Sequence, residues 1–462
     1  MLRIVWFWWL LAAGIGLASA VRAETLEQTL LSVYHNNPRI LSARASLRAL
    51  DENVARANSE YRPSVTAGAD IGYQTQKNRP RSLGTNGRTY PRGYGVTAVQ
   101  SLFNGFQTAN RVKSAKAGVR SGRASLLSLE QEVLLETIGV YVDVLRDETI
   151  VRIQQKHLGY ITREVAATRR RKIEGQVTRT DLSQSIARRA AALSRLQAAQ
   201  GSLRISRANF ERLVGHPPSK LVIPSRQLLK VPRTLSEAIA IGRKYHPEIV
   251  AALEEVRVAE HNIRAIRGEL LPNAQLQMDY SRDYDASSFT DRSDTFIAQG
   301  RVNIPIYTGG EVEARVRQAK HTKISRLQNV SQVRLQVTAN IEQAWAQMTV
   351  AKAQRRSIQL QVDENQKALN GVRKEERFGQ RTVAEVLNAA DALVNAQVSL
   401  TSNYRTVIVS SYSVLTAIGK LNMGNLKLTR NRYDPKVNYN RTHRRWGGLS
   451  ITYPDGRHEQ IK

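Results

Sequence analysis

The chain contains two copies of one sequence pattern. Landmark residues recur 209 positions later near the start of the pattern and 204 positions later beyond its middle: Leu26, Pro38 and Pro63 match Leu235, Pro247 and Pro272, and Gly105, Gly175 and Thr178 match Gly309, Gly379 and Thr382. Solenoid repeats have periods of roughly 20 to 50 residues, so a repeat this long indicates a duplicated half-structure. We expect one structural repeat over 24–230 and a second over 231–429, with the same order of elements.

Residues 1–23 have the layout of a secretory signal peptide. Arg3 precedes an apolar run over 4–17, and small residues follow it. This order predicts export and cleavage before Glu24. An uncleaved anchor is the alternative, although the run falls short of the ~20 apolar residues of a spanning helix. No later stretch is as apolar, so a mature chain that enters a membrane must do so as strands.

Two proline-free stretches, 92–216 and 306–434, predict long helices. Both are rich in Ala, Leu, Gln, Arg and Glu, which favour helix formation. Apolar residues recur at helical spacings that match between the copies, as in Leu126, Leu129 and Val133 against Val330, Val333 and Val337. Such periodicity is typical of helices packed as coiled coils. An unbroken helix of ~65 residues would be roughly 100 Å long, too long for a compact globular core.

Each helical stretch has a break at the matching place. Gly175 and Gly379 can take the left-handed conformation that ends a helix. Thr178 and Thr382 follow three residues later and can cap the next helix, with an acidic residue three positions on as in a capping box: Asp181 and Glu385. The sequence therefore predicts two helical hairpins with tight turns.

Between the short N-terminal helix of each copy and its helical hairpin, the pattern changes to a period of two. Apolar residues alternate with polar residues or glycine over 65–73 and 274–280, and returning strands are expected at roughly 94–103 and 296–306. The choice lies between a soluble hairpin with its apolar face on a core and part of a membrane barrel, which we favour. Four strands cannot close a barrel alone. Two chains would give eight strands, and three would give twelve.

The formal net charge is +30, a value that often accompanies nucleic-acid binding. Here Lys and Arg are spread along the whole chain and alternate with Glu, Asp and Gln. Because an exported protein also meets little nucleic acid, we expect no nucleic-acid partner. Lipopolysaccharide, anionic substrates or an acidic protein are better counterparts for this charge.

The two strand-connecting loops differ in sign. The first, 77–92, carries only bases, and the second carries four acids with two arginines: Asp283, Asp285, Asp291 and Asp294 with Arg282 and Arg292. They are either two solvated loops or neighbours that attract each other and narrow an opening. The tail over 430–462 departs from the repeat and combines basic with aromatic residues. It is expected either to be solvated and partly disordered or to clamp the outside of the folded body.

The sequence shows no constellation for catalysis. The chain has no cysteine, its eight histidines are scattered without metal-ligand spacing, and no glycine-rich phosphate loop follows a strand. We expect no enzyme activity, cofactor or metal, so energy for any transport must come from a partner.

Taken together, these motifs resemble the TolC family of trimeric outer-membrane efflux and secretion channels. The resemblance rests on Asn37-Pro38 and His246-Pro247 with the later Pro63 and Pro272, on the strand-to-helix turns at Gly105 and at Gly309-Gly310, and on the two glycine-threonine-acid breaks. It implies an α+β membrane protein: a homotrimer with a twelve-stranded outer-membrane β-barrel, four strands per chain, continuous with a twelve-helix periplasmic α-barrel. It also implies a mixed equatorial band and an outer-membrane location in a Gram-negative bacterium.

The resemblance further implies a passive channel that works with a periplasmic adaptor (membrane fusion) protein and an inner-membrane RND-type or ABC pump. In the family, the periplasmic end is closed by contacts between coiled coils. By motif match, Arg381 is the gating arginine, Thr180 and Asp181 are its partners, and Glu385 and Asn388 stand at the acidic constriction, which Asn388 weakens. Drug efflux and type I protein secretion remain open. The alternative is an exported coiled-coil scaffold or adaptor without a pore, and a cell-wall hydrolase is a distant third.

Overall fold

The computed structural model describes residues 23–76, 87–224, 230–287, 290–429 and 432–451, together with 453, 457 and 459. The predicted signal peptide and the basic positions Lys77, Arg79 and Arg81 of the first loop lie outside these residues, apart from Ala23.

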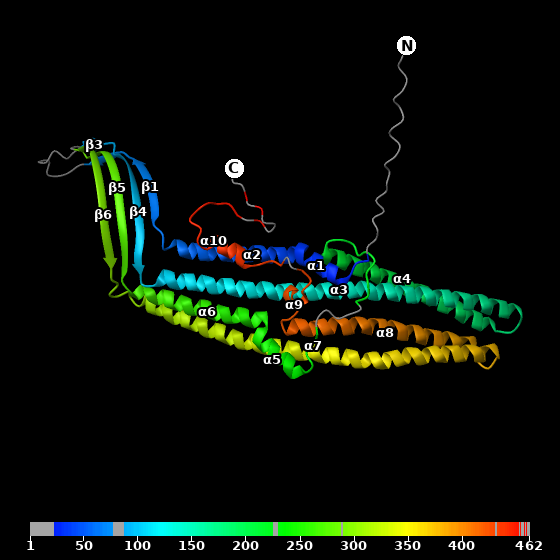
Figure 1. The fold of residues 1–462 in the computed structure, drawn as a ribbon. Helices are drawn as coiled ribbons and strands as arrows, with labels where there is room; N and C mark the ends of the chain where they lie inside the picture. Colours follow the sequence, from blue (N-terminus) through cyan, green and yellow to red (C-terminus); the bar gives the residue numbers. More distant parts are fainter. Residues whose placement is uncertain are drawn as a thin grey trace, which may run out of the picture. The chain divides into compact units, whose positions relative to one another are not determined.

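Apart from the short strands β2 and β3 of the first copy, the same order of elements occurs twice along the chain (Figure 1). The first series comprises α1 (Leu26–Asn36), α2 (Pro38–Ser59), β1 (Ser64–Ile71), β2 (Gln74–Gln76), β3 (Gly87–Thr89), β4 (Arg92–Asn104), α3 (Gln107–Ile173) and α4 (Arg179–Val214). The second comprises α5 (Leu235–Tyr245), α6 (Pro247–Arg267), a 3-10 turn (Gly268–Leu270), β5 (Asn273–Ser287), β6 (Thr290–Asn303), α7 (Glu311–Arg377) and α8 (Val383–Ala417). Two short helices follow, α9 (Met423–Leu426) and α10 (Lys436–Thr442).

Two compact units make up the fold, and each draws on both sequence copies. The helical unit consists of the chain up to Val33, Thr137–Gln227 and Ser357–Arg405. The sheet unit consists of Tyr34–Glu136, Leu228–Arg356 and Thr406–Lys462. The repeat boundaries at 24–230 and 231–429 stay a prediction.

Two helices of the sheet unit, α2 and α6, begin in the same way. The side chain of Asn37 accepts a hydrogen bond from the backbone of Arg39 at 2.9 Å, and Pro38 begins α2. In the second copy, Nδ1 of His246 accepts from the backbone of Glu248 at 3.3 Å, and Pro247 begins α6. Proline suits this position because the first helical N–H has no partner inside the helix. Pro63 and Pro272 stand directly before β1 and β5.

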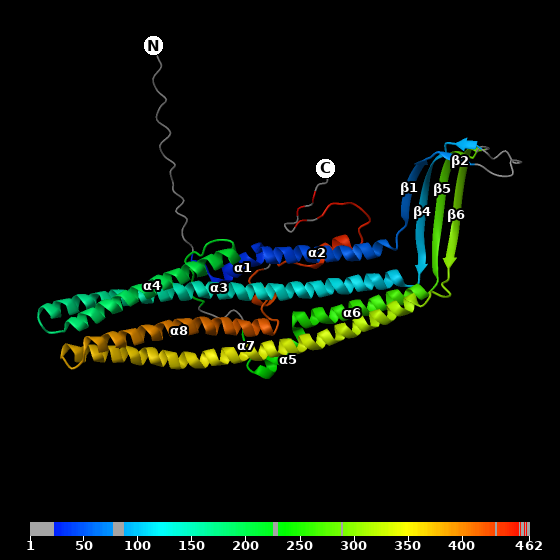
Figure 2. The same ribbon diagram turned by 180° about the vertical axis from the view of Figure 1, so that it is seen from behind.

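The principal sheet is antiparallel with the order β1-β4-β5-β6, and its strands lie side by side in Figure 2. Residues directly opposite each other share a face, and the register separates the faces by polarity. Ala67, Val96, Tyr280 and Phe296 lie across one face. The polar face carries Thr66, Thr97, Asp279, Gln277 and Gln299, with Val99 and Ile297 as apolar exceptions.

The apolar face is exposed in the described part of the chain. Val65 is 65% exposed, Ile71 84% and Phe296 69%. A soluble hairpin would bury these side chains against a core, so that alternative is wrong.

One strand end differs from the prediction. The apolar alternation continued to Ile306, but β6 ends at Asn303, so Ile304 and Ile306 lie beyond the strand. Pro305 accounts for the difference because it has no N–H for a strand ladder. Conversely, β5 extends to Ser287 and includes Asp283 and Asp285 of the acidic loop.

The strand-to-helix turn after β4 depends on a glycine. Gly105 has a φ of +63°, and a Cβ added to it would lie 2.0 Å from the carbonyl oxygen of Gly268. Gly309 and Gly310 also have positive φ, at 67° and 80°, but nothing lies within 4 Å of a Cβ at either position. The first copy therefore needs glycine for space as well as for conformation.

The first part of the C-terminal tail is docked along α2, so the solvated-tail interpretation is wrong for 432–446. Asn438 of α10 donates to the buried Asp51 at 2.9 Å, and Asn58 donates to the carbonyl of His443 at 2.8 Å. Arg62 stacks on the ring of Trp446, with its guanidinium carbon 4.7 Å from the centroid. These contacts agree with the clamp alternative.

Among the described helices, none is both long and apolar enough to cross a membrane.

Candidate functional site

The two hairpin turns of the helical unit hold the residues predicted to form the gate. Gly175 and Gly379 both have a φ of 74°, as the helix-ending role requires. Oγ1 of Thr178 accepts from the backbone N–H of Asp181 at 3.1 Å, and the Asp181 carboxylate accepts from the backbone of Thr178 at 2.9 Å. The predicted capping box is thus confirmed here, and the same reciprocal pair joins Thr382 and Glu385 at 3.3 and 2.8 Å.

Arg381 follows the second turn and pairs with two carboxylates of its own hairpin. Its Nε lies 2.9 Å from Glu375 and its Nη1 lies 2.8 Å from Glu385. All three side chains are more than 40% exposed. The backbone N–H of Thr382, with help from Arg381, lowers the pKa of Glu385. Glu385 therefore stays ionised at neutral pH and holds Arg381 at the hairpin turn.

Asp181 is engaged locally. Besides the backbone bond, its carboxylate accepts from Oγ1 of Thr178 at 2.7 Å, and these two bonds lower its pKa. Thr180 stands beside it and is exposed. Within one chain, then, Arg381 binds Glu375 and Glu385 whereas Asp181 binds Thr178. A bridge from Arg381 to Asp181 or Thr180 on an adjacent coiled coil would have to exchange or extend these contacts, and it stays a prediction.

Charged and apolar contacts tie the two hairpins of the chain together close to these turns. Arg171 of α3 pairs with Glu376 of α7 and, at 2.8 Å, with Glu164. Next to this pair, Ile161 and Val165 of α3 form a buried cluster with the α8 residues Val383 and Leu387.

A second polar centre surrounds Asp391 on α8. Its carboxylate lies 3.0 Å from Nε2 of His157 on α3, 3.0 Å from Arg188 and 3.1 Å from Arg195, both on α4. His157 is 2% exposed and Asp391 15%. The hydrogen bond from His157 is the largest cause of a lowered pKa at Asp391. Arg188 also donates to Asn388 at 2.8 Å, so Asn388 belongs to this centre.

Sequence reasoning missed Asp391, His157 and Arg171. Arg188 and Arg195 are seven positions apart, which places them on one face of α4, and this spacing was the available signal for a carboxylate partner. The identity of that partner was not readable, since Asp391 lies about 200 residues further along the chain.

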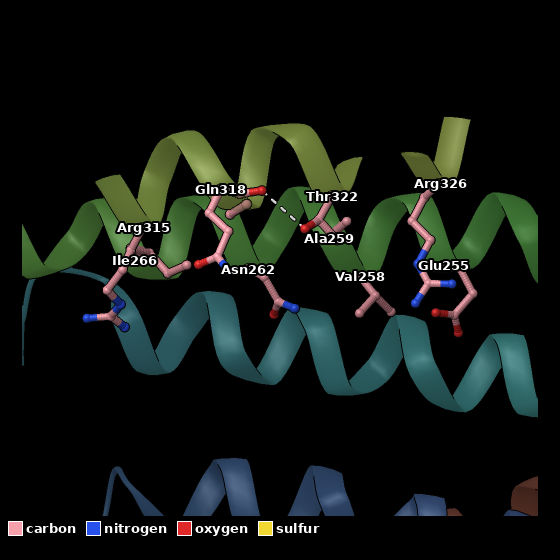
Figure 3. A pocket seen from close by; sticks show the side chains of 10 residues that line it. Glu255, Val258, Ala259, Asn262, Ile266, Arg315, Gln318, Thr322 and Arg326 are labelled. Carbon is pink, nitrogen blue, oxygen red and sulfur yellow. Dashed lines mark hydrogen bonds between the residues drawn. The ribbon is translucent and has the colours of Figure 1, made fainter. Parts of the chain in front are cut away.

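A groove of about 250 Å³ lies between α6 and α7 in the sheet unit (Figure 3). Glu255 is the one acidic residue that lines it, with Asn262, Gln318 and Arg315 among the others. Arg315 is held by Glu269 through two bonds of 2.6 and 3.0 Å. A glycoside hydrolase needs a pair of carboxylates across its cleft, and this groove does not provide one. The described residues also contain no group of three potential metal ligands.

The free end of the sheet carries the charged loop residues. Asp285 lies 3.3 Å from Arg92, which is one pair between the two oppositely charged loops. Asp294 instead pairs with Arg282 and Arg292 of its own strand pair. Within the described parts of the two loops, the predicted attraction is thus seen at Asp285, whereas Asp294 pairs inside its own strand pair.

Comparison with known proteins agrees with this arrangement. A family model described as outer membrane efflux protein matches residues 30–216 and 242–420. Outer membrane efflux protein BepC of Brucella suis biovar 1 is 35% identical over 97% of this chain and 96% of its own length. Outer membrane protein TolC of Vibrio cholerae is 23% identical over 89% of this chain and 94% of its own length. Alkaline protease secretion protein AprF of Pseudomonas aeruginosa is 23% identical over 70% and 67%.

The fold is shared with solved outer-membrane channels. The Campylobacter jejuni CmeC outer membrane channel superposes with a TM-score of 0.77 at 15% identity, over 90% of this chain and 89% of that one. On the family match and the similarity to BepC, the protein is located in the outer membrane and extends into the periplasm, and it is a passive channel component and not an enzyme. The chain belongs to the outer membrane efflux protein family and has the fold of TolC-like channels.

Proposed function

We propose that three copies of the chain close their sheets into one barrel and form the outer-membrane channel of a tripartite efflux system. The observation that carries the proposal is the two-faced sheet, whose apolar face is exposed and whose edge strands are β1 and β6. Unpaired edges are not tolerated in a bilayer, so β6 of one copy would pair with β1 of the next. Three copies give twelve strands, which leaves an aqueous lumen lined by the polar face.

The chain supplies a path and no energy, so a periplasmic adaptor and an inner-membrane RND-type or ABC pump would drive transport. Efflux is favoured over secretion because the relative called an efflux protein matches at 35% identity over 97% of this chain, whereas the protease secretion protein AprF matches at 23% over 70%. Secretion of a protein is the second candidate, supported by AprF.

The gate would lie at the hairpin turns. Arg381, held beside Glu385 and Glu375, is exposed and free to extend a contact toward Thr180 or Asp181 of a neighbouring copy. Each exposed pair is weak on its own. Three symmetric sets acting together would keep the open state a minor species.

Assembly is tested by cross-linking the purified protein in detergent and by conductance in planar bilayers. We expect cross-linking to stop at three chains and the trimer to conduct. A scaffold without a pore would not conduct in any oligomeric state. Conductance by a monomer would refute the shared barrel.

The gate is tested with Arg381→Ser combined with Asp181→Ala. We expect higher resting conductance and entry of large antibiotics such as vancomycin, with an unchanged yield of trimer. Glu385→Gln alone should change cation preference more than closure. Lys367→Ser is the matched control, because Lys367 pairs with Glu364 on the exposed surface of α7. Unchanged conductance of the double variant in an assembled trimer would place the gate elsewhere.

A further inference from the structure

At the free end of the sheet, three arginines belong to one face. Arg92 is directly opposite Tyr284, which is opposite Arg292, and Arg282 is opposite Tyr94. Ile71 is paired with Arg92 and Ala69 with Tyr94, so these arginines belong to the apolar face. On the other face, the same end of the sheet carries Asp70 and Asp283.

The apolar face is hollowed at this end. A cavity of about 360 Å³ is lined by Ala69, Ile71, Arg92, Tyr94 and Tyr284, together with Asp70 and Gly93 from the same strands. The first five all belong to the apolar face by register. The cavity thus combines aliphatic side chains, two phenol rings and a guanidinium.

Arginine and tyrosine are in contact around this cavity. The guanidinium carbon of Arg92 lies 5.5 Å from the ring centroid of Tyr284, and that of Arg282 lies 6.0 Å from the centroid of Tyr94. Arg92 is 56% exposed, and its bridge to Asp285 spans 3.3 Å. A guanidinium has five N–H donors, so Arg92 can donate hydrogen bonds to a further anion beside this carboxylate.

We propose that this surface, made by Arg92, Arg282 and Arg292 with Tyr94 and Tyr284, binds a phosphorylated, acylated lipid of the surrounding membrane leaflet. The inference rests on the proposed function, in which the apolar face meets lipid. Tyrosine is enriched where a membrane protein meets the headgroups, and arginine binds phosphate through paired hydrogen bonds. Ile71 and Ala69 lie level with the arginines, and an acyl chain would continue from them along the apolar face past Ala67 and Val96.

Charge complementarity selects the apolar face for this lipid. Asp70 and Asp283, which belong to the opposite face by register, would repel a phosphate from the lumen side. Asp294 competes for Arg282 and Arg292 on the binding side. Removal of the Asp294 carboxylate should therefore strengthen lipid binding, whereas removal of the arginines should weaken it.

The test is native mass spectrometry of the assembled trimer in detergent, with diphosphorylated lipid A as the probe. The variant is Arg92→Gln with Arg282→Gln and Arg292→Gln. The matched control is Arg301→Gln, which removes an arginine of the same sheet from the polar face. We expect at least tenfold weaker retention of lipid A in the triple variant and wild-type retention in the control. Asp294→Asn should bind lipid A more tightly than the wild type.

Two results would overturn the proposal: equal retention in the triple variant and the control, or equal retention of lipid A from which both phosphates have been removed. Full displacement of lipid A by millimolar inorganic phosphate would reduce the surface to a general anion site and would also overturn it. Conductance and trimer yield are measured on every sample. Loss of lipid retention in a conducting trimer supports the inference, whereas failure to trimerise or conduct in the wild type counts against the proposed function.

Discussion

Replacement of Asp391 by alanine should shift the channel toward its open state. The carboxylate joins α8 to α3 and α4 through His157, Arg188 and Arg195. A buried hydrogen bond to a charged group contributes about 1.5–3 kcal/mol, and the His157 bond is of this kind. The two arginines are 45% and 41% exposed, so each adds only ~0–1 kcal/mol. We expect these bonds to be made in the closed state and broken in the open state, so a loss of about 3 kcal/mol would change the ratio of closed to open channels roughly a hundredfold.

The assay is single-channel conductance in planar bilayers, together with the sensitivity of cells to vancomycin. Glu364→Ala is the control, because Glu364 pairs with Lys367 within one exposed face of α7. Since the pKa of Asp391 is lowered below 3.8, its contribution is present above that pH and is lost only as the pH falls through the lowered value. Asp391 should therefore cause no change in open probability between pH 5 and pH 8. An Asp391→Ala trimer with the resting conductance of the Glu364→Ala trimer would refute the reasoning.

Two further predictions concern the sheet unit. Burial raises the pKa of Glu130 from 4.5 to about 7. The contribution of the protonated Glu130 to the free energy of unfolding is therefore fully present below pH 4.5 and is lost as the pH rises through 7. The loss is on the order of 3 kcal/mol. Glu130→Gln should flatten this dependence in thermal unfolding, and an unchanged slope would contradict it. Asn438→Ala leaves the fully buried Asp51 without a donor and should cost about 1–3 kcal/mol, with faster proteolysis of the tail. The exposed Asn440→Ala is its control, and equal proteolysis of the two would argue against a clamp.

Local signals predicted most of the fold, and long-range pairings account for what they missed. The glycine turns, capping boxes and strand faces depend on residues a few positions apart, and all were readable. The prediction for the end of the second returning strand was wrong because the apolar periodicity continues across Pro305. Pro305 has no backbone N–H to donate to a strand ladder, and β6 ends at Asn303. Docking of the tail on α2 could not be read, because Asn438 and Asp51 are 387 positions apart and nothing local indicates their contact.

For the gate, the sequence indicated the position of the hairpin turns and not the partners. Arg381 has two nearby carboxylates, Glu375 and Glu385, and both are used. The resemblance to the family named Asp181 and Thr180 instead, as partners of Arg381 on an adjacent coiled coil. Several partners of similar strength compete for one exposed arginine, so spacing alone does not decide among them.

The duplication offers a test in which the two copies serve as each other's control. Gly105 and Gly309 are matching residues with φ of +63° and +67°. Alanine at either position should lower the free energy of unfolding by roughly 1–2 kcal/mol, because the left-handed conformation is unfavourable for a residue with a Cβ. At Gly105 the new Cβ would also lie 2.0 Å from the Gly268 carbonyl oxygen, and at Gly309 it would meet nothing within 4 Å.

Relief of that overlap requires the turn before α3 to move away from the end of α6, because the atom it meets belongs to the backbone. We expect Gly309→Ala to assemble with a modest loss of thermal stability and Gly105→Ala to lose most of its trimer. Heat-modifiable migration of outer-membrane fractions measures both. If the two variants lose the same amount of trimer, the left-handed conformation alone explains why both copies have glycine here. The close approach of Gly105 to Gly268 would then not be what holds this turn. If only Gly105→Ala fails, the two copies of one ancestral turn now have different packing requirements, although they share a backbone conformation.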